Sequence, residues 1–424
     1  MSTIEVTSPF DGKVVGTVPF TSVEGVEKAI DVAYEKFLDV DNWLPKYKRI
    51  EILENLMEIM SSQVEELTIL CASEGGKPYM DSKVEIQRAI NGVKIAIEQL
   101  AVQEGQEIAM GHTASSANRM AYTMKEPIGV VAAISAFNHP FNLAVHQVIP
   151  ALAVGCPVII RPATQTPMSA VRLVELLKEA GLPDGWAQAV VCDRQGGELL
   201  VTSPKTAFFT FIGSGPVGWY LNSKSSPGTR AALEHGGVAP VIVEPDADID
   251  AMIPDLGKGG FYHAGQVCVS VQRVYVHESI VDEVASKLTD YASKLVVGDQ
   301  LDPKTEVGPL INNNEVNRVE EWVNEAVEKG GKILTGGKRI SDSCYEPTVI
   351  LNPADDALVS TKEVFGPVVI VYSYSNIDEA IARANSLDVS FQAAVFTKNI
   401  DTALKAVKRL NGTAVMVNDH TAFR

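Results

Sequence analysis

Short apolar runs that alternate with amphipathic segments constrain the fold of this chain more than any other feature. From residue 128 onward, the runs "GVVAAIS", "PVIIRP" and "TAFFTFIG" each precede a segment with apolar residues at three- and four-residue intervals, which is helical spacing. Strands that alternate with helices form a parallel sheet that helices cover on both faces. The sequence therefore predicts a Rossmann-like, doubly wound α/β domain.

A second alternating series begins near residue 248. It contains the strand-like runs "VQRVYVH", "PVVIVYSY" and "AAVFTK" between helical segments, so we predict a second α/β domain, with the junction near residues 234–238. The first hundred residues are predicted to be mainly helical, with Gly75, Gly76 and Pro78 as a break. A more polar alternating segment, "SSANRMAYTMKEPIG", predicts a small protruding arm over residues 112–127 that pairs with another subunit.

The composition of the chain excludes several classes of protein. Its 53 acidic and 36 basic residues give a net charge of −17, which repels nucleic acids and anionic membrane surfaces. The apolar runs are too short to span a membrane, and the N-terminus "MSTIEVTSPFDGK" does not resemble a secretory signal. Five scattered cysteines without a C-x-x-C pair, and seven histidines without H-x-x-x-H spacing, favour reduced thiols and no metal site. We therefore expect a cytoplasmic protein.

Four loops of the first domain should line one crevice, because ligands of an open parallel sheet bind beyond the carboxyl ends of its strands. These loops read "AFNHP", "RPATQTP", "GSGPVG" and "EHGG". The Gly213–Ser214–Gly215 turn exposes backbone N–H groups at the start of a helix, which suits a phosphate. Glycine turns after strands are common, however, and an ordinary turn explains this one equally well.

Three side chains in or near these loops could carry chemistry, and each has a simpler alternative. Glu234 is either a general base or a solvated carboxylate. Asn138 either donates its amide to a developing oxyanion or caps the following helix. Cys268, in "FYHAGQVCVS", is either a nucleophile or a buried thiol. Together they would supply a nucleophile, a base and an oxyanion donor beside a phosphate cradle.

The same stretches resemble the aldehyde dehydrogenase superfamily. "FNHPFN", "RPATQTP", "GSGPVG", "LEHGG", "GQVCVS" and "EVFGPV" occur in the order of that family, over a range from Val6 to Asn418. The resemblance implies a coenzyme-binding domain over residues 1–111 and 128–236, an oligomerisation arm over 112–127 and a catalytic domain over 237–424. It also implies NAD(P)-dependent oxidation of an aldehyde to its carboxylic acid.

The resemblance assigns roles to individual residues. Cys268 would attack the aldehyde to give a thiohemiacetal, Asn138 and the Cys268 backbone N–H would hold its oxyanion, and Glu234 would activate the water that hydrolyses the resulting thioester. The implied cofactor-binding residues are Phe137, Arg161, Pro162, Ala163, Thr164, Gly213, Ser214, Val217, Gly218, His235, Gly236, Glu363 and Phe365.

Three positions depart from the family pattern. Arg161 stands where most members have Lys, and Thr164 stands where members that prefer NAD often have Glu. The missing carboxylate removes repulsion toward a 2′-phosphate, so we expect NADP, with NAD still open. His139 replaces a common Phe. It either hydrogen-bonds a polar or anionic group of a small aldehyde or only packs its ring, and the first alternative predicts short polar substrates.

The end of the chain is a fourth departure. The sequence stops at "VMVNDHTAFR", where family members continue with a glycine-rich turn and a terminal strand. We expect either a truncated chain or a reduced homologue, which forms a homodimer or homotetramer if that strand is supplied. Two other functions stay open: transfer of the acyl group to coenzyme A, as in acylating semialdehyde dehydrogenases, and a non-catalytic nucleotide-binding homologue. Retention of Glu234, Cys268 and Asn138 favours hydrolysis.

Overall fold

The first domain is built on a five-stranded parallel sheet. In this computed structural model, which describes residues 2–388 and 391–422, the strand order is β7-β6-β5-β8-β9. Parallel pairing places the carboxyl ends of all five strands at one edge of the sheet. The strands are β5 (Val130–Ile134), β6 (Val158–Arg161), β7 (Ala187–Ala189), β8 (Thr206–Ile212) and β9 (Arg230–Glu234).

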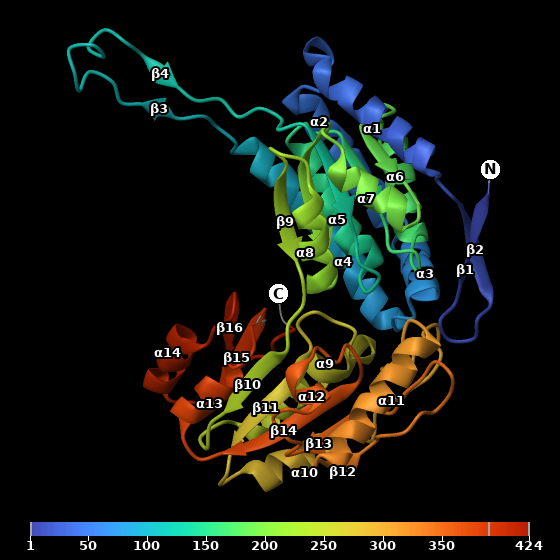
Figure 1. Cartoon of the computed structure of the whole chain (residues 1–424), viewed down its shortest axis with the longest axis vertical. Coiled ribbons are helices and arrows are strands. Elements are labelled where there is room, and N and C mark those ends of the chain that lie inside the picture. Colours follow the sequence, from blue (N-terminus) through green and yellow to red (C-terminus); the bar gives the residue numbers. More distant parts are fainter. Residues whose placement is uncertain (1, 389–390, 423–424) are drawn as a thin grey trace.

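Helices cover both faces of this sheet (Figure 1). Val131 and Ala133 of the fully buried strand β5 join a core with α2 to α6, whereas Val130 and Ala132 join a core with α1 and α7. This alternation confirms the predicted doubly wound domain. The helices are α1 (Val23–Leu38), α2 (Lys46–Ser62), α3 (Val64–Gly75), α4 (Tyr79–Ala101), α5 (Pro140–Ala153), α6 (Met168–Glu179), α7 (Arg194–Thr202) and α8 (Gly215–Lys224).

The second domain has a seven-stranded sheet with the order β12-β13-β14-β11-β10-β15-β16. All neighbours are parallel except β12 and β13, which pair antiparallel. The strands are β10 (Ala239–Val243), β11 (Val271–His277), β12 (Lys332–Thr335), β13 (Thr348–Leu351), β14 (Val368–Tyr374), β15 (Gln392–Phe396) and β16 (Ala414–Val417). The helices are α9 (Ile249–Phe261), the 3₁₀ helix η2 (Tyr262–Gly265), α10 (Val281–Ala292), α11 (Asn313–Glu328), α12 (Leu358–Thr361), α13 (Ile377–Ala384) and α14 (Ile400–Arg409).

Several short elements were not predicted from the sequence. An N-terminal hairpin of β1 (Thr3–Thr7) and β2 (Val14–Pro19) precedes the helices, and a 3₁₀ turn, η1 (Val40–Asn42), follows α1. Residues 46–75 form two helices, α2 and α3, because Gln63 leaves the helical conformation between them. Strands β7, β12 and β13 have only three or four residues each, too few to show a clear period.

The predicted arm is a hairpin that projects away from the first domain (Figure 1). Its strands are β3 (Glu107–Ile108) and β4 (Ala121–Tyr122), which pair antiparallel. Because β3 lies ahead of residue 112, the arm begins earlier than the sequence indicated.

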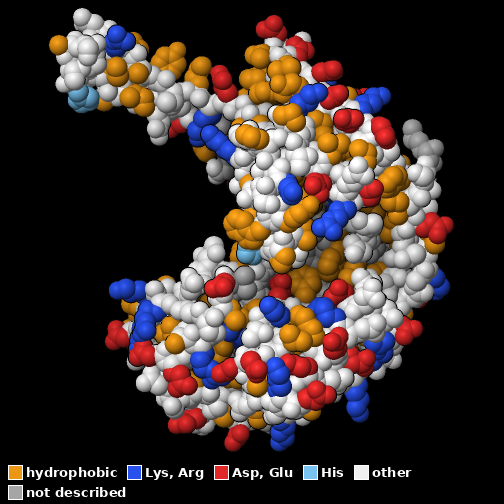
Figure 2. Space-filling model, in the orientation of Figure 1, with side chains coloured by type: hydrophobic (Ala, Val, Ile, Leu, Met, Phe, Trp, Pro, Cys, Tyr) orange, Lys and Arg blue, Asp and Glu red, His pale blue; other side chains and the backbone are white. Residues whose placement is uncertain are grey.

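The carboxyl ends of the strands in the first sheet lie opposite the amino ends of the strands in the second sheet, across a crevice. Asn138, Gly213 and Glu234 follow the carboxyl ends of β5, β8 and β9, while Cys268 and Phe365 precede the amino ends of β11 and β14. Figure 2 shows the hollow between the domains on one side of the molecule. Within the described part of the chain, every helix is too short or too polar to span a membrane.

Candidate active site

The loop that carries Cys268 has an unusual backbone. His263, Ala264 and Gly265 have φ values of 50°, 54° and 68°, a left-handed region that residues with a side chain rarely adopt. Such strain persists only where the surrounding structure enforces it, and it concentrates at functional sites. Cys268 follows this run and is half-buried, directly before β11.

Contacts from the second domain hold this loop in place. A side chain at Gly265 would put its Cβ 2.1 Å from the carbonyl oxygen of Gly366, so only glycine fits. Gln266 is fully buried and bridges to the next loop, because its Nε2 donates to the Pro309 carbonyl (3.2 Å) and its Oε1 accepts from the Ile311 N–H (2.9 Å). Although Gln266 is polar, its side chain is not exposed to solvent, and its two hydrogen bonds anchor the loop to the second domain.

The far side of Cys268 is also fixed. The hydroxyl of Thr421 donates to the carbonyl of Val269 at 2.7 Å, and Thr421 is fully buried. The Ser270 hydroxyl donates to the carbonyls of Gly259 and Gly260 in α9, at 3.4 and 3.3 Å. The segment after β16 therefore returns to the loop that bears the thiol.

Asn138 crosses the crevice to the same loop. It lies between the end of β5 and the start of α5, is 4% exposed, and its Nδ2 donates to the carbonyl of Gln266 at 3.0 Å. A primary amide has two N–H groups, so this bond orients the side chain and leaves a second donor. The structure thus brings the predicted oxyanion donor next to the predicted nucleophile loop.

Glu234 is the last residue of β9 and is half-buried. Its backbone carbonyl accepts from the Gly213 N–H at 3.1 Å, which joins the "EHGG" and "GSGPVG" loops. An added Cβ on Gly215 would lie 3.6 Å from the ring of His235. These contacts place Glu234, His235 and the glycine turn side by side at the carboxyl edge of the first sheet.

The "EVFGPV" loop of the second domain closes over these residues. The Glu363 carboxylate lies against Gly236, where an added Cβ would be 1.9 Å from its Oε1. Burial raises the pKa of Glu363 to about 8, although the charge of Arg318 opposes this shift. The rings of Phe137 and Phe365 meet edge to face, with centroids 5.7 Å apart. Predicted cofactor residues of both domains therefore form one cluster.

The residues present fit a nucleotide cofactor. Among the described residues, Glu363 Oε1 and Arg161 Nε are buried without a hydrogen-bond partner, and a ribose hydroxyl can satisfy such atoms. Ser214 caps α8 without a side-chain hydrogen bond, so the first N–H groups of that helix are not used by a capping side chain.

The other predicted cofactor residues lie around this cluster. Arg161 ends β6; its Nη2 donates to the Cys192 carbonyl at 3.3 Å, and its side chain passes over Gly197, where a Cβ would be 2.9 Å away. Thr164 is exposed and Val217 is 44% exposed. Gly218 packs against the Phe211 ring, a structural role. Pro162 is buried and Ala163 half-buried in the loop after β6.

His139 contacts two residues that the sequence analysis missed. Its Nδ1 lies 2.6 Å from Lys77 Nζ, and Lys77 in turn pairs with Glu85 on α4. Both side chains are 1% exposed. The signal was present in the helical pattern, because Glu85 shares the apolar face of α4 with Ile86, Ala89 and Val93. A charged residue among buried apolar residues is almost always paired, so Glu85 predicts a buried ion pair.

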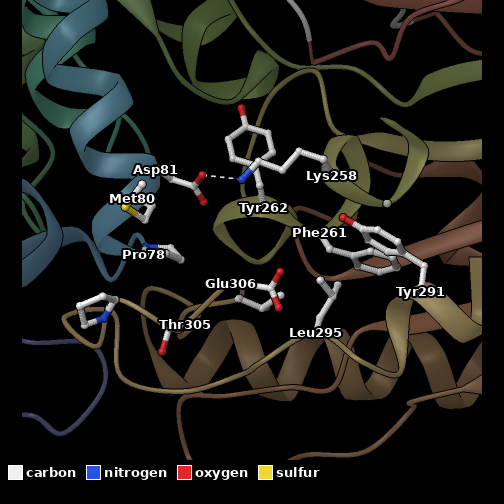
Figure 3. A pocket seen from close by; sticks show the side chains of 13 residues that line it. Pro78, Met80, Asp81, Lys258, Phe261, Tyr262, Tyr291, Leu295, Thr305 and Glu306 are labelled. Atoms are coloured by element: carbon white, nitrogen blue, oxygen red, sulfur yellow. Dashed lines mark hydrogen bonds and ion pairs between the residues drawn. The ribbon is translucent and has the colours of Figure 1, made fainter. Parts of the chain in front are cut away.

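A small cavity lies at the domain boundary beside this region (Figure 3). Its volume is about 120 Å³ and it is lined by α4, α9, η2 and the segment around Glu306. The ion pair between Lys258 and Asp81, at 2.5 Å, crosses it from one domain to the other. It contains none of the predicted site residues. Among residues 2–388 and 391–422, no cluster of three His, Cys, Asp or Glu side chains could hold a metal.

Comparison with known proteins identifies the family of this chain. A sequence model of the aldehyde dehydrogenase family matches residues 1–424. The chain belongs to the aldehyde dehydrogenase family. This aldehyde dehydrogenase is 39% identical to 3-sulfolactaldehyde dehydrogenase of Priestia aryabhattai, over 99% of the chain and 87% of the relative. It is 35% identical to lactaldehyde dehydrogenase of Methanocaldococcus jannaschii, over 99% and 90% of the two chains.

Solved structures agree with this assignment. The crystal structure of aldehyde dehydrogenase 21 from Physcomitrella patens in complex with succinate superposes with a TM-score of 0.96 and 34% identity, covering 100% of this chain and 88% of that one. Glyceraldehyde-3-phosphate dehydrogenase from M. jannaschii, complexed with NADP, gives a TM-score of 0.94 at 34% identity, over 99% and 91%. The resemblance seen in the sequence is confirmed: the protein is an oxidoreductase that uses NAD or NADP to oxidise an aldehyde.

Proposed function

We propose that this aldehyde dehydrogenase oxidises a short anionic aldehyde to its acid, with Cys268 as nucleophile, Asn138 as oxyanion donor and Glu234 as base. The observation that carries the proposal is the 3.0 Å bond from Asn138 Nδ2 to the Gln266 carbonyl, which links the amide to the loop of the thiol. Asn138 follows β5, Glu234 ends β9 and Cys268 precedes β11, so the three residues lie around one crevice, as a shared catalytic role requires.

In the proposed mechanism, the Cys268 thiolate forms a C–S bond with the aldehyde carbon, and the carbonyl oxygen gains the negative charge. The second N–H of the Asn138 amide and the Cys268 backbone N–H donate to that oxygen. The C=O bond re-forms as the same carbon loses a hydride, which a bound nicotinamide would accept, and an acyl-cysteine results. Glu234 then removes a proton from the water that attacks the acyl-cysteine, and cleavage of the C–S bond releases the acid and restores the thiol.

We further propose that Arg88 selects an anionic substrate. Arg88 is half-buried on α4, and none of the described carboxylates forms a salt bridge with it. It stands three residues after Glu85, so the two side chains lie on the same side of α4. Burial and then the charge of Lys77 lower the pKa of His139, and the charge of Arg88 adds a smaller effect in the same direction. The relatives named above act on or bind sulfolactaldehyde, lactaldehyde and succinate. Sulfolactaldehyde and succinate are anions, and lactaldehyde is polar but neutral.

A panel of aldehydes tests the substrate class. We expect kcat/KM for succinic semialdehyde to exceed that for butanal, and Arg88→Met to reduce this ratio by about 10- to 100-fold, because a charged hydrogen bond contributes about 1.5–3 kcal/mol. NADPH absorbance measures the rates. Lys94→Met, on an exposed face of the same helix, is the control and should leave the ratio unchanged. Equal turnover of both aldehydes by the wild type would contradict the proposal.

We propose NADP as the preferred cofactor, since Thr164 puts no carboxylate near the adenosine ribose and Arg161 supplies positive charge. Thr164→Glu is expected to raise the Kd for NADP by about 10-fold or more, because like charges within hydrogen-bond distance repel. The Kd for NAD should stay constant or fall. Fluorescence titration of both cofactors measures the change, and tighter NAD binding by the wild type would refute the assignment.

We also propose a cytoplasmic homo-oligomer that uses the arm as an interface. The arm exposes Met120, Tyr122 and Met124, at 86%, 69% and 70%, and apolar patches of this kind mark protein contacts. Light scattering after gel filtration is expected to give a mass of two or four chains. Replacing these three side chains with Ser should give monomers, and a wild-type monomer would rule the interface out.

A further inference from the structure

A group of polar side chains, buried except for the half-buried His139, underlies the loop that carries Asn138. It consists of Cys71 on α3, Lys77 between α3 and α4, Glu85 on α4, and His139. Lys77 and Glu85 form a salt bridge in which each side chain is 1% exposed. Apolar residues of the same volume often stabilise a fold as well as a buried ion pair does. The pair therefore points to a role in geometry rather than in stability alone.

Glu85 caps a helix to which it does not belong. Its Oε1 accepts the N–H groups of Phe141 and Asn142, at 3.0 and 2.9 Å, in the first turn of α5. The residue at the N-cap position, His139, makes no capping bond with its side chain. The carboxylate from α4 therefore satisfies the first donors of α5 and fixes where that helix begins. Asn138 lies immediately before the N-cap.

The other oxygen of Glu85 fixes the neighbouring ring. Oε2 pairs with Lys77 and accepts from the Cys71 thiol at 3.2 Å, while Lys77 Nζ lies 2.6 Å from His139 Nδ1. An ammonium group can only donate, so Nδ1 accepts and the neutral ring carries its proton on Nε2. Burial and then the charge of Lys77 lower the pKa of His139 to about 4, so the ring is neutral at pH 7.

The carboxylate remains ionised in this setting. Burial opposes ionisation of Glu85, but the charge of Lys77 and the hydrogen bonds outweigh it and hold the pKa of the carboxyl well below its usual range. Glu85 therefore stays a strong acceptor for the α5 N–H groups over the whole working range of pH.

We propose that the Lys77–Glu85 pair is a positioning device for the oxyanion donor: Glu85 fixes the first turn of α5, Lys77 fixes the His139 ring, and together they hold Asn138 against the nucleophile loop. This inference rests on the proposed role of Asn138. Neither Lys77 nor Glu85 touches the reacting atoms in this scheme, and both act through the Asn138–His139 backbone.

A double-mutant cycle tests the proposal. Glu85→Gln keeps an oxygen for the Phe141 and Asn142 N–H groups but leaves the charge of Lys77 without its partner. In the wild-type background it is expected to lower kcat by about 10- to 100-fold, the cost of a misplaced catalytic group. In the Asn138→Ala background the same change should cost less than about 3-fold, because the group it positions is already gone.

Glu74→Gln provides the matched control. Glu74 is also fully buried and caps another helix, since its Oε2 and Oε1 accept the Met168 and Ser169 N–H groups at 2.7 and 2.8 Å. That helix, α6, does not carry Asn138. Any cost of Glu74→Gln in kcat should be the same in both backgrounds, since the two sites share no proposed function.

Two further measurements keep the test decisive. If the Glu85→Gln variant does not fold, the double variant Lys77→Met/Glu85→Gln takes its place in the cycle. This double variant removes both buried charges, so neither is left without a partner. The rate at which iodoacetamide alkylates Cys268 should change by less than about 3-fold, because the pair acts on the oxyanion donor and not on the thiol. Equal costs of Glu85→Gln in both backgrounds would overturn the positioning role. No effect of Asn138→Ala by itself would instead overturn the proposed function.

Discussion

Cys268→Ala is expected to lower kcat by about 10⁴-fold or more, the usual cost of removing a nucleophile that forms a covalent intermediate. The Kd for NADP should change by less than about 3-fold, because the predicted phosphate and ribose contacts come from other loops. Initial rates of NADPH formation and fluorescence titration measure the two quantities. The substitution removes one sulfur from a half-buried position, so circular dichroism should show an unchanged fold.

The control is Cys344→Ala. Cys344 is 2% exposed and lies in the second domain, where its backbone N–H donates to the Ser341 hydroxyl at 3.1 Å. Loss of this thiol is expected to cost stability of about 1 kcal/mol with kcat unchanged. If Cys268→Ala retained more than about one tenth of the wild-type activity, a cysteine mechanism at this position would be excluded.

Asn138→Ala is expected to lower kcat by about 10²- to 10³-fold, as the loss of one preorganised oxyanion donor does elsewhere. KM should change little, since the amide donates to charge that develops only after attack. Single-turnover kinetics would separate the slow attack step from cofactor binding. Because the Asn138 amide also holds the Gln266 carbonyl, the midpoint of thermal unfolding should fall by a few degrees.

Asn138→Asp refines this test, because it keeps the size of the side chain but replaces the donor with a negative charge. Its kcat should be no higher than that of the Ala variant, since a carboxylate repels the developing oxyanion. A kcat above the Ala value would show that Asn138 acts through shape alone and would remove the oxyanion role from the mechanism.

The doubly wound domain was predictable because its central strands β5 and β6 are apolar on both faces and alternate with helical segments along the chain. β5 is buried at all five residues, and this leaves a run such as "GVVAAIS" in the sequence. The hairpin of β1 and β2 was not predictable in this way, since most of its residues are exposed or half-buried and only Val6 and Val18 are buried. The antiparallel pairing of β12 depends on its neighbour β13 and not on its own residues.

The site divides in a similar manner. Cys268, Glu234 and Asn138 stand at or near the ends of regular elements, where the order of strands and helices makes them candidates, and their proposed roles come from the resemblance to aldehyde dehydrogenases. The ion pair of Lys77 and Glu85 was missed, because its meaning depends on a helix more than fifty residues further along the chain. The contacts of Gln266 were not predictable for the same reason, since its partners Pro309 and Ile311 are distant in sequence.

The contact between Asn138 and Gln266 joins residues that are 128 positions apart, and it has a consequence for how the protein is made. Contacts between distant residues form late, and domains of a nascent chain generally fold in order of synthesis. The first sheet and its helices, which lie within residues 23–234, can therefore assemble before the second domain is complete. The bond that holds Asn138 against the Cys268 loop forms only when the second domain docks, so the proposed site is completed only at that step.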